Sequence, residues 1–327
     1  MLQTDWRSLH GSAFAGARCL VTGGAGFIGS HIVEALTKLS ASVIVLDDLS
    51  GGATPNIDPF KPEFVKGTIL DRDALGAATR GCKYVFHLAA LGSVPHSVER
   101  PVEYHEADAT GCVRVLEAAR HAGAKRVIYS ASSSCYGDSP ELPKRETMAT
   151  SPRSPYAAAK LAGEAYMAAY AASYGIDTAA LRYFNIFGPR QNANSAYAAV
   201  IAAFAKAVIA GKPPTIFGDG TQSRDFTYVH NAVHANLLAA RSDKPIRGEP
   251  INVACGVRID LNTLAPAMCE LLGRPDLKPT YAPERAGDVK HSQADLSKAR
   301  DVLGYRPVVQ FHDGLAETVK WYREVLK

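Results

Sequence analysis

A glycine-rich loop near the N-terminus constrains the fold of this chain more than any other feature. The segment RCLVTGGAGFIGS places Gly23, Gly26 and Gly29 directly after an apolar run and directly before an amphipathic stretch. Glycines at this spacing provide a tight turn, a close approach of the backbone to a pyrophosphate, and close packing of a helix on a strand. The free N–H groups at the start of such a helix favour phosphate binding. The loop therefore predicts a dinucleotide-binding unit.

Short apolar strands alternate with alanine-rich amphipathic stretches through the first 185 residues. The expected strands are Arg18–Thr22, Ser42–Leu46, Glu63–Lys66, Tyr84–Leu88, Arg126–Ser130 and Thr178–Tyr183. The expected helices are Phe27–Leu39, Asp73–Thr79, Val102–His121 and Tyr156–Tyr174. Such alternation builds a parallel sheet with helices on both faces. We therefore expect an α/β protein with a Rossmann-like doubly wound parallel sheet that binds ligands at the C-terminal ends of its strands.

The alternation breaks down after Asn185. Loop-forming residues concentrate in 188–194, 211–220 and 243–250. We therefore predict an NAD-binding Rossmann domain over residues 1–186 and a smaller C-terminal α/β substrate-binding domain over 187–327. Segments near 229–258, a helix over Asn231–Arg241 and a strand over Ile251–Ala254, are expected to return to the first domain.

Two carboxylates, Asp47 and Asp48, end the second expected strand, about 20 residues beyond the glycine loop. A carboxylate at this place accepts hydrogen bonds from the adenosine ribose hydroxyls and repels the 2′-phosphate of NADP. The sequence therefore predicts NAD as the cofactor.

Composition and charge exclude several classes of function. The formal net charge is only +4, without a block of like charges, so nucleic-acid binding is not expected. The six cysteines form no CxxC pair and have no histidine at zinc-ligand spacing, which predicts a reduced cytoplasmic protein without a metal site. The N-terminal segment lacks the apolar core of a signal peptide, and no stretch reaches the ~20 apolar residues that span a bilayer.

A tyrosine, a lysine and a serine cluster form the candidate catalytic group. Tyr156 and Lys160 lie four residues apart on an expected helix and therefore share one face. A tyrosine with a pKa of about 10 is a poor base at neutral pH. A nearby ammonium and a positively charged nicotinamide favour the phenolate, so we expect the pKa of Tyr156 to be lowered. The segment SASSSCYG, residues 130–137, places hydroxyls at the same edge of the sheet.

Taken as a set, the motifs of this chain resemble those of the extended short-chain dehydrogenase/reductase family, and within it the UDP-hexose 4-epimerases. The resemblance runs from about Ala17 to the C-terminus. The motifs that carry it are TGGAGFIGSH (22–31), the serine cluster followed by Tyr136-Gly137, SPYAAAK (154–160), RYFNIFGPRQN (182–192), GDGTQSRDFTYV (218–229) and ERAGDVKHSQAD (284–295). AALGSVP (89–95), the RQN after FGP, and AYAAVI (196–201) resemble most the bacterial branch that epimerises UDP-N-acetylglucosamine and UDP-N-acetylgalactosamine.

The resemblance implies a role for each matched residue. Tyr156 takes the place of the catalytic acid/base, Lys160 that of the residue that holds the nicotinamide ribose, and Ser132 that of the serine that hydrogen-bonds the C4 oxygen. The implied cofactor-binding residues are Gly23, Gly26, Phe27, Ile28, Gly29, Asp47, Asp48, Ile69, Leu88, Ala89, Ala90, Tyr156, Lys160 and Tyr183. The implied substrate-binding residues are Gly92, Ser133, Ser134, Asn185, Gln191, Ala199, Val200, Phe217, Arg224, Arg285, Asp288 and Ser292. Among them, the two arginines are expected to clamp the diphosphate.

The chain departs from the family pattern at two places. Gly67-Thr68-Ile69 stands where relatives have Gly-Asp-Ile, and Asp108 stands where the NxxGT motif has an asparagine. Both positions concern cofactor binding.

The serine cluster separates epimerisation from related reactions. Relatives that eliminate water carry Asp-Glu at the positions of Ser133 and Ser134, and decarboxylating relatives carry a glutamate at Ser134. Serine hydroxyls are not general acids or bases near neutral pH. The implied reaction is therefore oxidation at C4 by NAD, rotation of the 4-keto sugar, and return of the hydride to its other face.

Two small residues favour acetylated substrates. Ser292 stands where epimerases restricted to UDP-glucose and UDP-galactose carry a tyrosine, and Gly92 stands where some relatives carry a lysine. A UDP-glucose or UDP-glucuronate 4-epimerase is the alternative enzyme, and a non-catalytic dinucleotide-binding sensor is the alternative of another class. By analogy with the family we also expect a homodimer.

Overall fold

The computed structural model describes residues 4–193, 199–284 and 290–326. Its centre is a seven-stranded parallel sheet in the order β11-β6-β5-β4-β1-β2-β3. The strands are β1 Arg18–Thr22, β2 Ser42–Asp47, β3 Glu63–Lys66, β4 Tyr84–His87, β5 Arg126–Ser132, β6 Asp177–Tyr183 and β11 Pro250–Val253. The expected strands are therefore confirmed to within two residues, and the fold is Rossmann-like as predicted.

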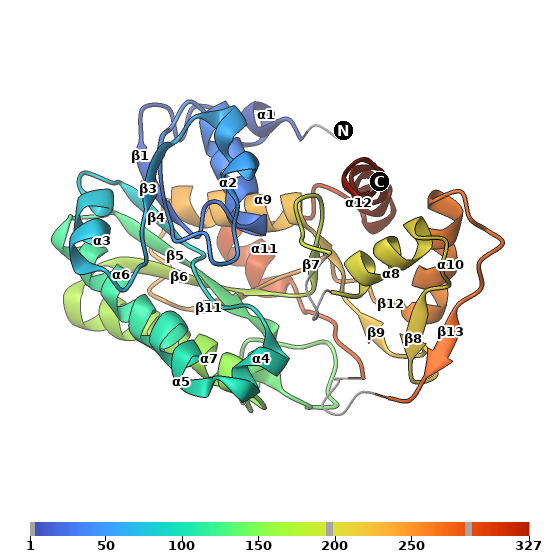
Figure 1. The fold of residues 1–327 in the computed structure, drawn as a ribbon. Coiled ribbons are helices and arrows are strands. Elements are labelled where there is room, and N and C mark those ends of the chain that lie inside the picture. The colour runs from blue at the N-terminus through green and yellow to red at the C-terminus, as the bar shows by residue number, and fades with distance from the viewer. Residues whose placement is uncertain (1–3, 194–198, 285–289, 327) are drawn as a thin grey trace.

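Helices cover both faces of this sheet (Figure 1). The main helices are α2 Phe27–Lys38 and α9 Val229–Arg241 on one face, and α3 Arg72–Thr79, α6 Gly111–His121 and α7 Pro155–Tyr174 on the other. Successive strand residues point to opposite faces. In β1, Cys19 and Val21 join the core beneath α2 and α9, whereas Leu20 joins the core beneath α3, α6 and α7.

The strand order reverses between β1 and β4. From β1 the chain runs outward through β2 and β3, then crosses back to β4, which pairs with β1 on its other side. In parallel sheets a ligand crevice opens at this reversal, outside the C-terminal ends of the strands. Gly23 directly follows β1 and Leu88 directly follows β4, so both segments lie at that crevice.

A late segment of the chain returns to the central sheet. β11 pairs with β6 in parallel, and α9 packs against β5 and β6. A short helix, α11 Ser297–Leu303, also joins this core through Ala299 and Leu303, although we assigned that segment to the second part.

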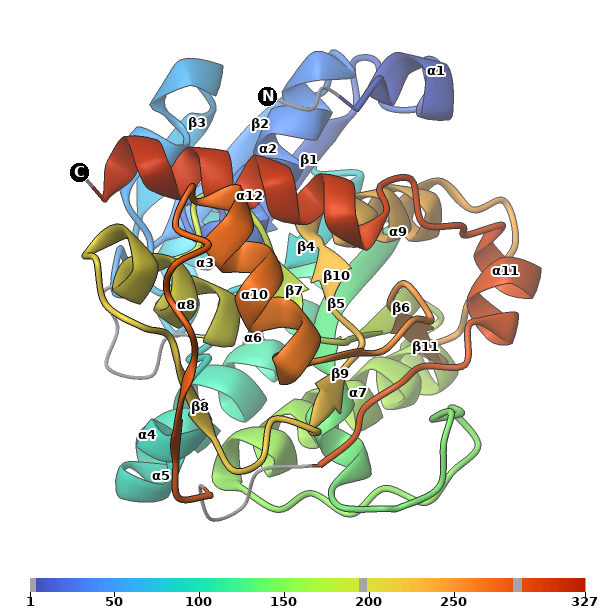
Figure 2. The same cartoon turned by 90° about the vertical axis from the view of Figure 1, so that its right-hand side faces the viewer.

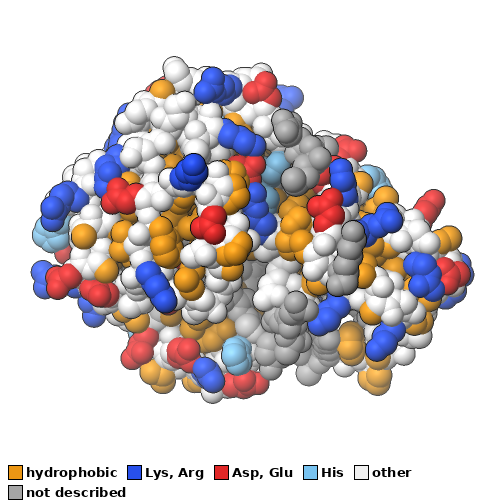
Figure 3. Space-filling view, turned by 45° about the horizontal axis from the view of Figure 1, so that its top comes forward, with side chains coloured by type: hydrophobic (Ala, Val, Ile, Leu, Met, Phe, Trp, Pro, Cys, Tyr) orange, Lys and Arg blue, Asp and Glu red, His pale blue; other side chains and the backbone are white. Residues whose placement is uncertain are grey.

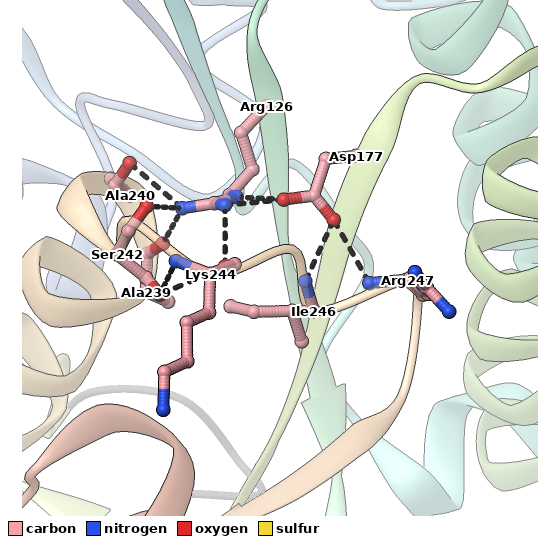
Figure 4. Close-up of polar contacts among 8 residues, drawn as sticks. All are labelled: Arg126, Asp177, Ala239, Ala240, Ser242, Lys244, Ile246 and Arg247. Atoms are coloured by element: carbon pink, nitrogen blue, oxygen red, sulfur yellow. Dashed lines mark hydrogen bonds and ion pairs between the residues drawn. The ribbon is translucent and has the colours of Figure 1, made fainter.

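A buried arginine ties the returning segment to the sheet (Figure 4). Arg126 of β5 bonds to the carboxylate of Asp177 on β6, while its Nη1 donates to the carbonyl oxygens of Ala239 (2.6 Å) and Ser242 (2.9 Å) at the end of α9. The other Asp177 oxygen accepts from the backbone of Ile246 at 2.9 Å. The guanidinium thus satisfies carbonyls that a helix end leaves without partners.

The segment expected to be one helix over Val102–His121 is interrupted. It consists of α5 Pro101–Tyr104, a π-helical turn η3 over His105–Thr110, and α6, and is preceded by a further helix, α4 Val94–Glu99. Gly111 begins α6 where an added Cβ would lie 2.5 Å from Ile69 Cδ1, so the chain approaches that residue closely. π-Helical turns inside helices often occur at functional sites.

A short N-terminal helix, α1 Trp6–His10, packs on α2 and was not foreseen. His10 Nε2 lies 3.0 Å from Nδ1 of His234 on α9, and Arg241 Nε donates to His10 Nδ1 at 3.1 Å. The three groups fix the N-terminal helix on the outer face of α9.

A second core forms from the later part of the chain (Figure 2). Its helices are α8 Val200–Ile209, α10 Leu261–Leu271 and α12 Phe311–Val325. They contact one another, and Figure 2 shows α12 crossing beside α10 and α8. Short strand pairs complete this part: β7 Ile186–Phe187 with β10 Thr227–Tyr228, β8 Thr215–Phe217 with β13 Thr280–Ala282, and β9 Ser223–Arg224 with β12 Ile259–Asp260.

The surface carries charged side chains of both signs. On the face in Figure 3, acidic and basic side chains alternate without a large patch of one sign. Within the described parts of the chain, no helix has both the length and the apolar character needed to cross a bilayer.

Candidate active site

A cavity of about 360 Å³ opens at the crevice between β1 and β4. Most of the residues expected to bind the cofactor line it: Gly23, Gly26, Phe27, Ile28, Gly29, Asp47, Asp48, Ile69, Leu88, Ala89 and Ala90. Gly92, expected at the sugar, lies in the same wall. Gly67 and Thr68, from the motif that we expected to concern cofactor binding, also line the cavity. The wall further includes residues that we did not predict: Leu46, Ser50, Gly51, Gly52, Leu91, Ala107 and Ser130. The glycine pair after β2, Gly51 and Gly52, was a sequence signal for this part of the wall. An added Cβ on Gly52 would lie 2.7 Å from the carbonyl carbon of Ala25, so the backbone approaches the glycine loop closely there.

The glycine loop fits a dinucleotide. Gly23 has φ +68°, and a Cβ there would lie 2.6 Å from the Ala89 backbone nitrogen. A Cβ on Gly29 would lie 2.1 Å from the Gly23 carbonyl oxygen. Gly26 occupies the N-cap position just before α2, and it has no side chain that could cap the helix. The first N–H groups of α2 therefore face the cavity end without a side-chain partner, which suits a pyrophosphate.

Asp47 is buried at the adenosine end of this cavity. Its Oδ2 accepts from Ala25 N at 2.9 Å and its Oδ1 from Leu49 N at 2.8 Å. The carboxylate thus anchors the glycine loop, and each oxygen retains a lone pair for a ribose hydroxyl. Burial raises the pKa of Asp47, and the two backbone hydrogen bonds oppose that shift. The neighbouring Asp48 is exposed and accepts from Ser50 N at 2.8 Å.

The structure brings the three expected catalytic side chains together. Ser132 ends β5, and Tyr156 lies in the first turn of α7, whose start is capped by Ser154. The Ser132 side chain interacts with the Tyr156 phenol and favours its phenolate form, which lowers the pKa of Tyr156. Ser134 Oγ donates to Ser132 Oγ at 2.9 Å, so a second serine holds the first in place.

Lys160 lies one turn beyond Tyr156 and is buried. Its Nζ donates to the Ser130 carbonyl oxygen at 3.0 Å and lies 5.1 Å from the centre of the Tyr129 ring. The ring fits beneath α7 because Gly163 has no side chain: a Cβ there would lie 2.4 Å from the Tyr129 hydroxyl. The ammonium therefore occupies a fixed position at the end of β5.

The expected lowering of the Tyr156 pKa does not occur in the protein alone. Burial raises the pKa of the phenol to about 12, the interaction with Ser132 lowers it, and the charge of Asp108 raises it further. Burial also lowers the pKa of Lys160. The phenol is thus protonated at neutral pH, and a positive charge next to it, such as that of an oxidised nicotinamide, is needed to favour the phenolate.

Three expected cofactor residues, Tyr156, Lys160 and Tyr183, are not among the residues of the cavity wall. Tyr183, which pairs with Ser132 across the two strands, is buried in the core beneath α9. Its hydroxyl accepts a hydrogen bond from Asn236 Nδ2 at 2.6 Å. Tyr183 supports the strand that carries the serine rather than lining the cavity described above.

Most of the other expected substrate residues lie in the chain that follows β6. Asn185 is exposed directly after β6 and has φ +35°, a conformation that is uncommon outside glycine and occurs often at functional sites. Gln191 donates from Nε2 to the Ile186 carbonyl oxygen at 3.2 Å, and its Oε1 is buried. Ala199 and Val200 begin α8, and Phe217 ends β8.

Arg224 and Ser292 are neighbours. Arg224 ends β9 and donates to the Ser223 and Lys290 carbonyl oxygens, and Ser292 N donates to the same Ser223 oxygen at 3.0 Å. Ser133 and Ser134 form the helical turn after β5. The expected contacts of Arg285 and Asp288 lie outside the described residues.

A buried carboxylate that we did not predict organises the substrate side. Asp225 follows Arg224, is fully buried, and accepts from the backbone nitrogens of Cys255 (3.0 Å), Gly256 and Ala294 (3.1 Å). Burial raises the pKa of Asp225 to about 6, and the backbone hydrogen bonds oppose that shift. The hydrogen-bond partners of Asp225 are distant in the sequence. The only sequence signal for its role was its position next to Arg224 in a motif that resembles the family.

Among the described residues, no group of three or more histidines, cysteines and carboxylates could hold a metal ion. The candidate site therefore consists of a dinucleotide cavity and a Ser–Tyr–Lys group beside Ser130 in the cavity wall.

Comparisons with known proteins agree with this geometry. Residues 19–254 match the model of the NAD dependent epimerase/dehydratase family. The UDP-glucose 4-epimerase of Mycolicibacterium smegmatis is 40% identical over 313 residues, covering 94% of this chain and 98% of that protein.

Two solved structures are also similar. The UDP-N-acetylglucosamine 4-epimerase from Methanobrevibacter ruminantium, in complex with UDP-N-acetylmuramic acid, is 42% identical with a TM-score of 0.90, covering 95% of this chain and 99% of that one. The UDP-glucose 4-epimerase from Thermus thermophilus, in complex with NAD, is 36% identical with a TM-score of 0.85, covering 94% and 99%. The predicted cofactor, NAD, is thus confirmed, and the chain belongs to the NAD dependent epimerase/dehydratase family.

Proposed function

We propose that this protein, a UDP-sugar 4-epimerase, acts on UDP-N-acetylglucosamine and UDP-N-acetylgalactosamine and also accepts UDP-glucose and UDP-galactose. The observation that carries the reaction is the grouping of Ser132, which interacts with the Tyr156 phenol, with Lys160, which is bonded to Ser130 in the wall of the NAD cavity. No carboxylic acid replaces a serine in the turn that follows Ser132.

Tyr156 and Ser132 have different roles at the C4 oxygen of the sugar. Tyr156 removes the C4 hydroxyl proton and later returns a proton to the same oxygen, while Ser132 hydrogen-bonds that oxygen. Bound NAD supplies the chemistry of hydride removal from C4 and its return. Lys160 holds the nicotinamide ribose from its fixed position on the Ser130 carbonyl. Because the sugar regains the hydride it lost, there is no net oxidation.

The polar turn after β5 favours epimerisation over elimination. Ser133 and Ser134 supply only hydroxyls, and the Ser134 hydroxyl is already bonded to Ser132. Loss of water across C5–C6 needs an additional acid and base, and a serine hydroxyl performs neither role near neutral pH. The 4-keto sugar therefore has only one outcome in this site, reduction from one of its two faces.

The acetylated sugars are favoured by open space. A Cβ added to Gly92 in the cavity wall would meet no atom within 4 Å. Ser292 is a small side chain next to the strand that carries Arg224. An epimerase must hold the nucleotide while its sugar turns over, so the substituent at C2 needs room in both orientations. The similarity to the Methanobrevibacter ruminantium enzyme supports the same substrate class.

The test is a comparison of four substrates. We expect kcat/KM for UDP-N-acetylglucosamine and UDP-N-acetylgalactosamine to equal or exceed that for the non-acetylated pair. Ser292→Tyr should lower kcat/KM for the acetylated pair by at least tenfold and spare UDP-galactose, since a steric clash of ~1.4 kcal/mol or more has that effect. Ser297→Tyr, at an exposed position on α11, adds the same bulk away from the site and serves as the control.

Two outcomes would contradict the substrate assignment. Turnover of the non-acetylated pair alone would identify a UDP-glucose 4-epimerase, and turnover of UDP-glucuronate alone would identify a UDP-glucuronate 4-epimerase. Loss of both pairs in Ser292→Tyr would show that Ser292 does not select at C2. Homodimerisation and a cytoplasmic location stay predictions.

A further inference from the structure

A buried carboxyl oxygen next to the catalytic helix has no hydrogen-bond partner. Asp108 lies in the π-helical turn η3, which packs against α7, and only 1% of its surface is exposed. Its Oδ1 accepts from Leu91 N at 2.8 Å. Its Oδ2 is equally shielded from water and accepts no hydrogen bond from the described residues. Buried carboxylates are normally paired, so this oxygen needs an electrostatic explanation.

The nearby cation is also incompletely satisfied. Lys160 has three N–H donors, of which one donates to the Ser130 carbonyl, and 4% of the residue is exposed. A buried ammonium loses its proton unless an opposite charge is close. The Asp108 carboxylate opposes the effect of burial on the pKa of Lys160. Burial likewise raises the pKa of Asp108, and the charge of Lys160 and the Leu91 hydrogen bond oppose that shift.

The other titratable groups around the pair are neutral at neutral pH or already paired. They are Tyr104 on α5, Cys112 on α6, His87 on β4, Tyr129 on β5, and Tyr156 and Glu164 on α7. Burial lowers the pKa of His87 to about 3 and raises that of Cys112 to about 12. Glu164 is bound to Arg182. Among these groups, only Asp108 remains to balance the charge on Lys160.

We infer that Asp108 is a positioning residue that acts through Lys160: its carboxylate is the counter-ion that keeps the lysine protonated where the nicotinamide ribose binds. Its hydrogen bond to Leu91 also joins this charge to the loop that lines the cavity. An asparagine, the residue that the family motif has here, would keep the Leu91 hydrogen bond but would leave the ammonium without a counter-ion. In this chain the carboxylate therefore sets the pH range over which the Tyr156–Lys160 pair is active.

The test removes the negative charge of Asp108 and keeps the shape of its side chain. In Asp108→Asn, the pKa of Lys160 should fall by about one unit or more. It is measured by NMR on protein with ¹³Cε-labelled lysine, with the Lys160 signal assigned by its absence in Lys160→Met. The Lys160 titration requires no sugar substrate, so a failure of this inference is distinct from a failure of the proposed substrate.

Activity provides the second measurement. Because the Asp108 charge also raises the pKa of Tyr156, both limbs of the kcat/KM profile against pH should move to lower pH in Asp108→Asn. Glu106→Gln removes an exposed charge from the same helical turn and should move neither the lysine titration nor the profile. If the amide variant does not fold, Asp108→Ser takes its place. An unchanged Lys160 titration in the variant, or an equal shift in Glu106→Gln, would overturn the inference.

Discussion

Arg182 binds Glu164 through two hydrogen bonds, Nε to Oε2 at 2.9 Å and Nη2 to Oε1 at 2.5 Å, about two turns along α7 from Tyr156. Both side chains are buried. The guanidinium also lies 4.8 Å from the centre of the Tyr136 ring, in the turn after Ser132. The ion pair therefore connects the helix that carries Tyr156 to the strand and turn that carry the serines.

This ion pair should affect turnover more than binding. In Glu164→Gln the neutral amide holds Arg182 less firmly, so α7 can shift against β6 and Tyr156 can move from Ser132. We expect kcat to fall roughly 10- to 100-fold, since small misplacements of reacting groups have effects of this size. KM for the UDP-sugar should stay within about threefold. Glu117→Gln, which removes an exposed carboxylate paired with Arg120 on α6, is the control. Equal kcat values for wild type and Glu164→Gln would show that the pair does not position Tyr156.

The Arg126 network should matter for stability. Arg126→Lys keeps the charge but cannot bond simultaneously to Asp177 and to the carbonyls at the end of α9. The variant should lower the free energy of unfolding by about 2–4 kcal/mol, the range for breaking a buried charged network. Urea unfolding monitored by circular dichroism gives this value. Arg100→Lys, in an exposed pair with Glu103, should leave the midpoint nearly unchanged; a similar change in the two variants would argue against the network.

Buried histidines between helices α1 and α9 should make the fold acid-sensitive: His10 on α1, and His230 and His234 on α9. Arg241 donates to His10 Nδ1, so His10 carries its proton on Nε2 and donates to His234. A second proton on His10 would sit on Nδ1, where it would face the Arg241 N–H group and remove the acceptor of that hydrogen bond. Burial lowers the pKa of His10 to about 3 and those of His230 and His234 to about 4. The unfolded chain binds these protons at about pH 6.5, so the stabilisation is complete above pH 6.5 and is lost as pH falls toward 4.

The corresponding measurement is urea unfolding at several pH values between 4 and 7. Wild type should lose stability steadily over this window. His234→Gln, which removes one titrating group, should show a shallower loss, whereas His105→Gln at an exposed position should behave as wild type. A pH slope that is identical in all three proteins would mean that the buried histidines do not cause the acid sensitivity.

Removal of a single hydroxyl tests the general base. Tyr156→Phe takes away the proton-transferring group and little packing volume, so turnover should fall by roughly 10²–10⁴-fold or more. UDP-sugar affinity, measured by calorimetry, should stay within severalfold. Ser132→Ala should reduce kcat less, because water can replace one hydrogen bond. Tyr84→Phe, in the core away from the cavity, provides the control for a lost tyrosine hydroxyl. Near wild-type turnover by Tyr156→Phe would assign the proton transfer to another residue.

Features that depend on residues close together in the chain could be predicted from the sequence. The glycine loop, the expected strands and the Tyr156–Lys160 spacing each depend on residues near one another in the chain, and the structure places them as expected. The late strand β11 pairs with β6 at the edge of the same sheet.

Features that depend on contacts between distant segments were not predictable. The bonds of Asp225 reach residues 255, 256 and 294, and helix α1 is fixed by histidines more than 200 positions away. The π-helical turn η3 replaces part of an expected helix where Gly111 meets Ile69. The raised pKa of Tyr156 likewise follows from burial, which spacing alone does not show.

In the proposed reaction, C4 of the sugar is oxidised by loss of a hydride and is reduced again when the same hydride returns. We would incubate the protein with UDP-N-acetylglucosamine carrying deuterium at C4, in ordinary water, and examine the UDP-N-acetylgalactosamine formed by NMR and mass spectrometry. The account predicts that the product retains the deuterium at C4 and takes no hydrogen from the solvent there. Replacement of the deuterium by solvent hydrogen, or its appearance at another carbon, would contradict a hydride cycle at C4.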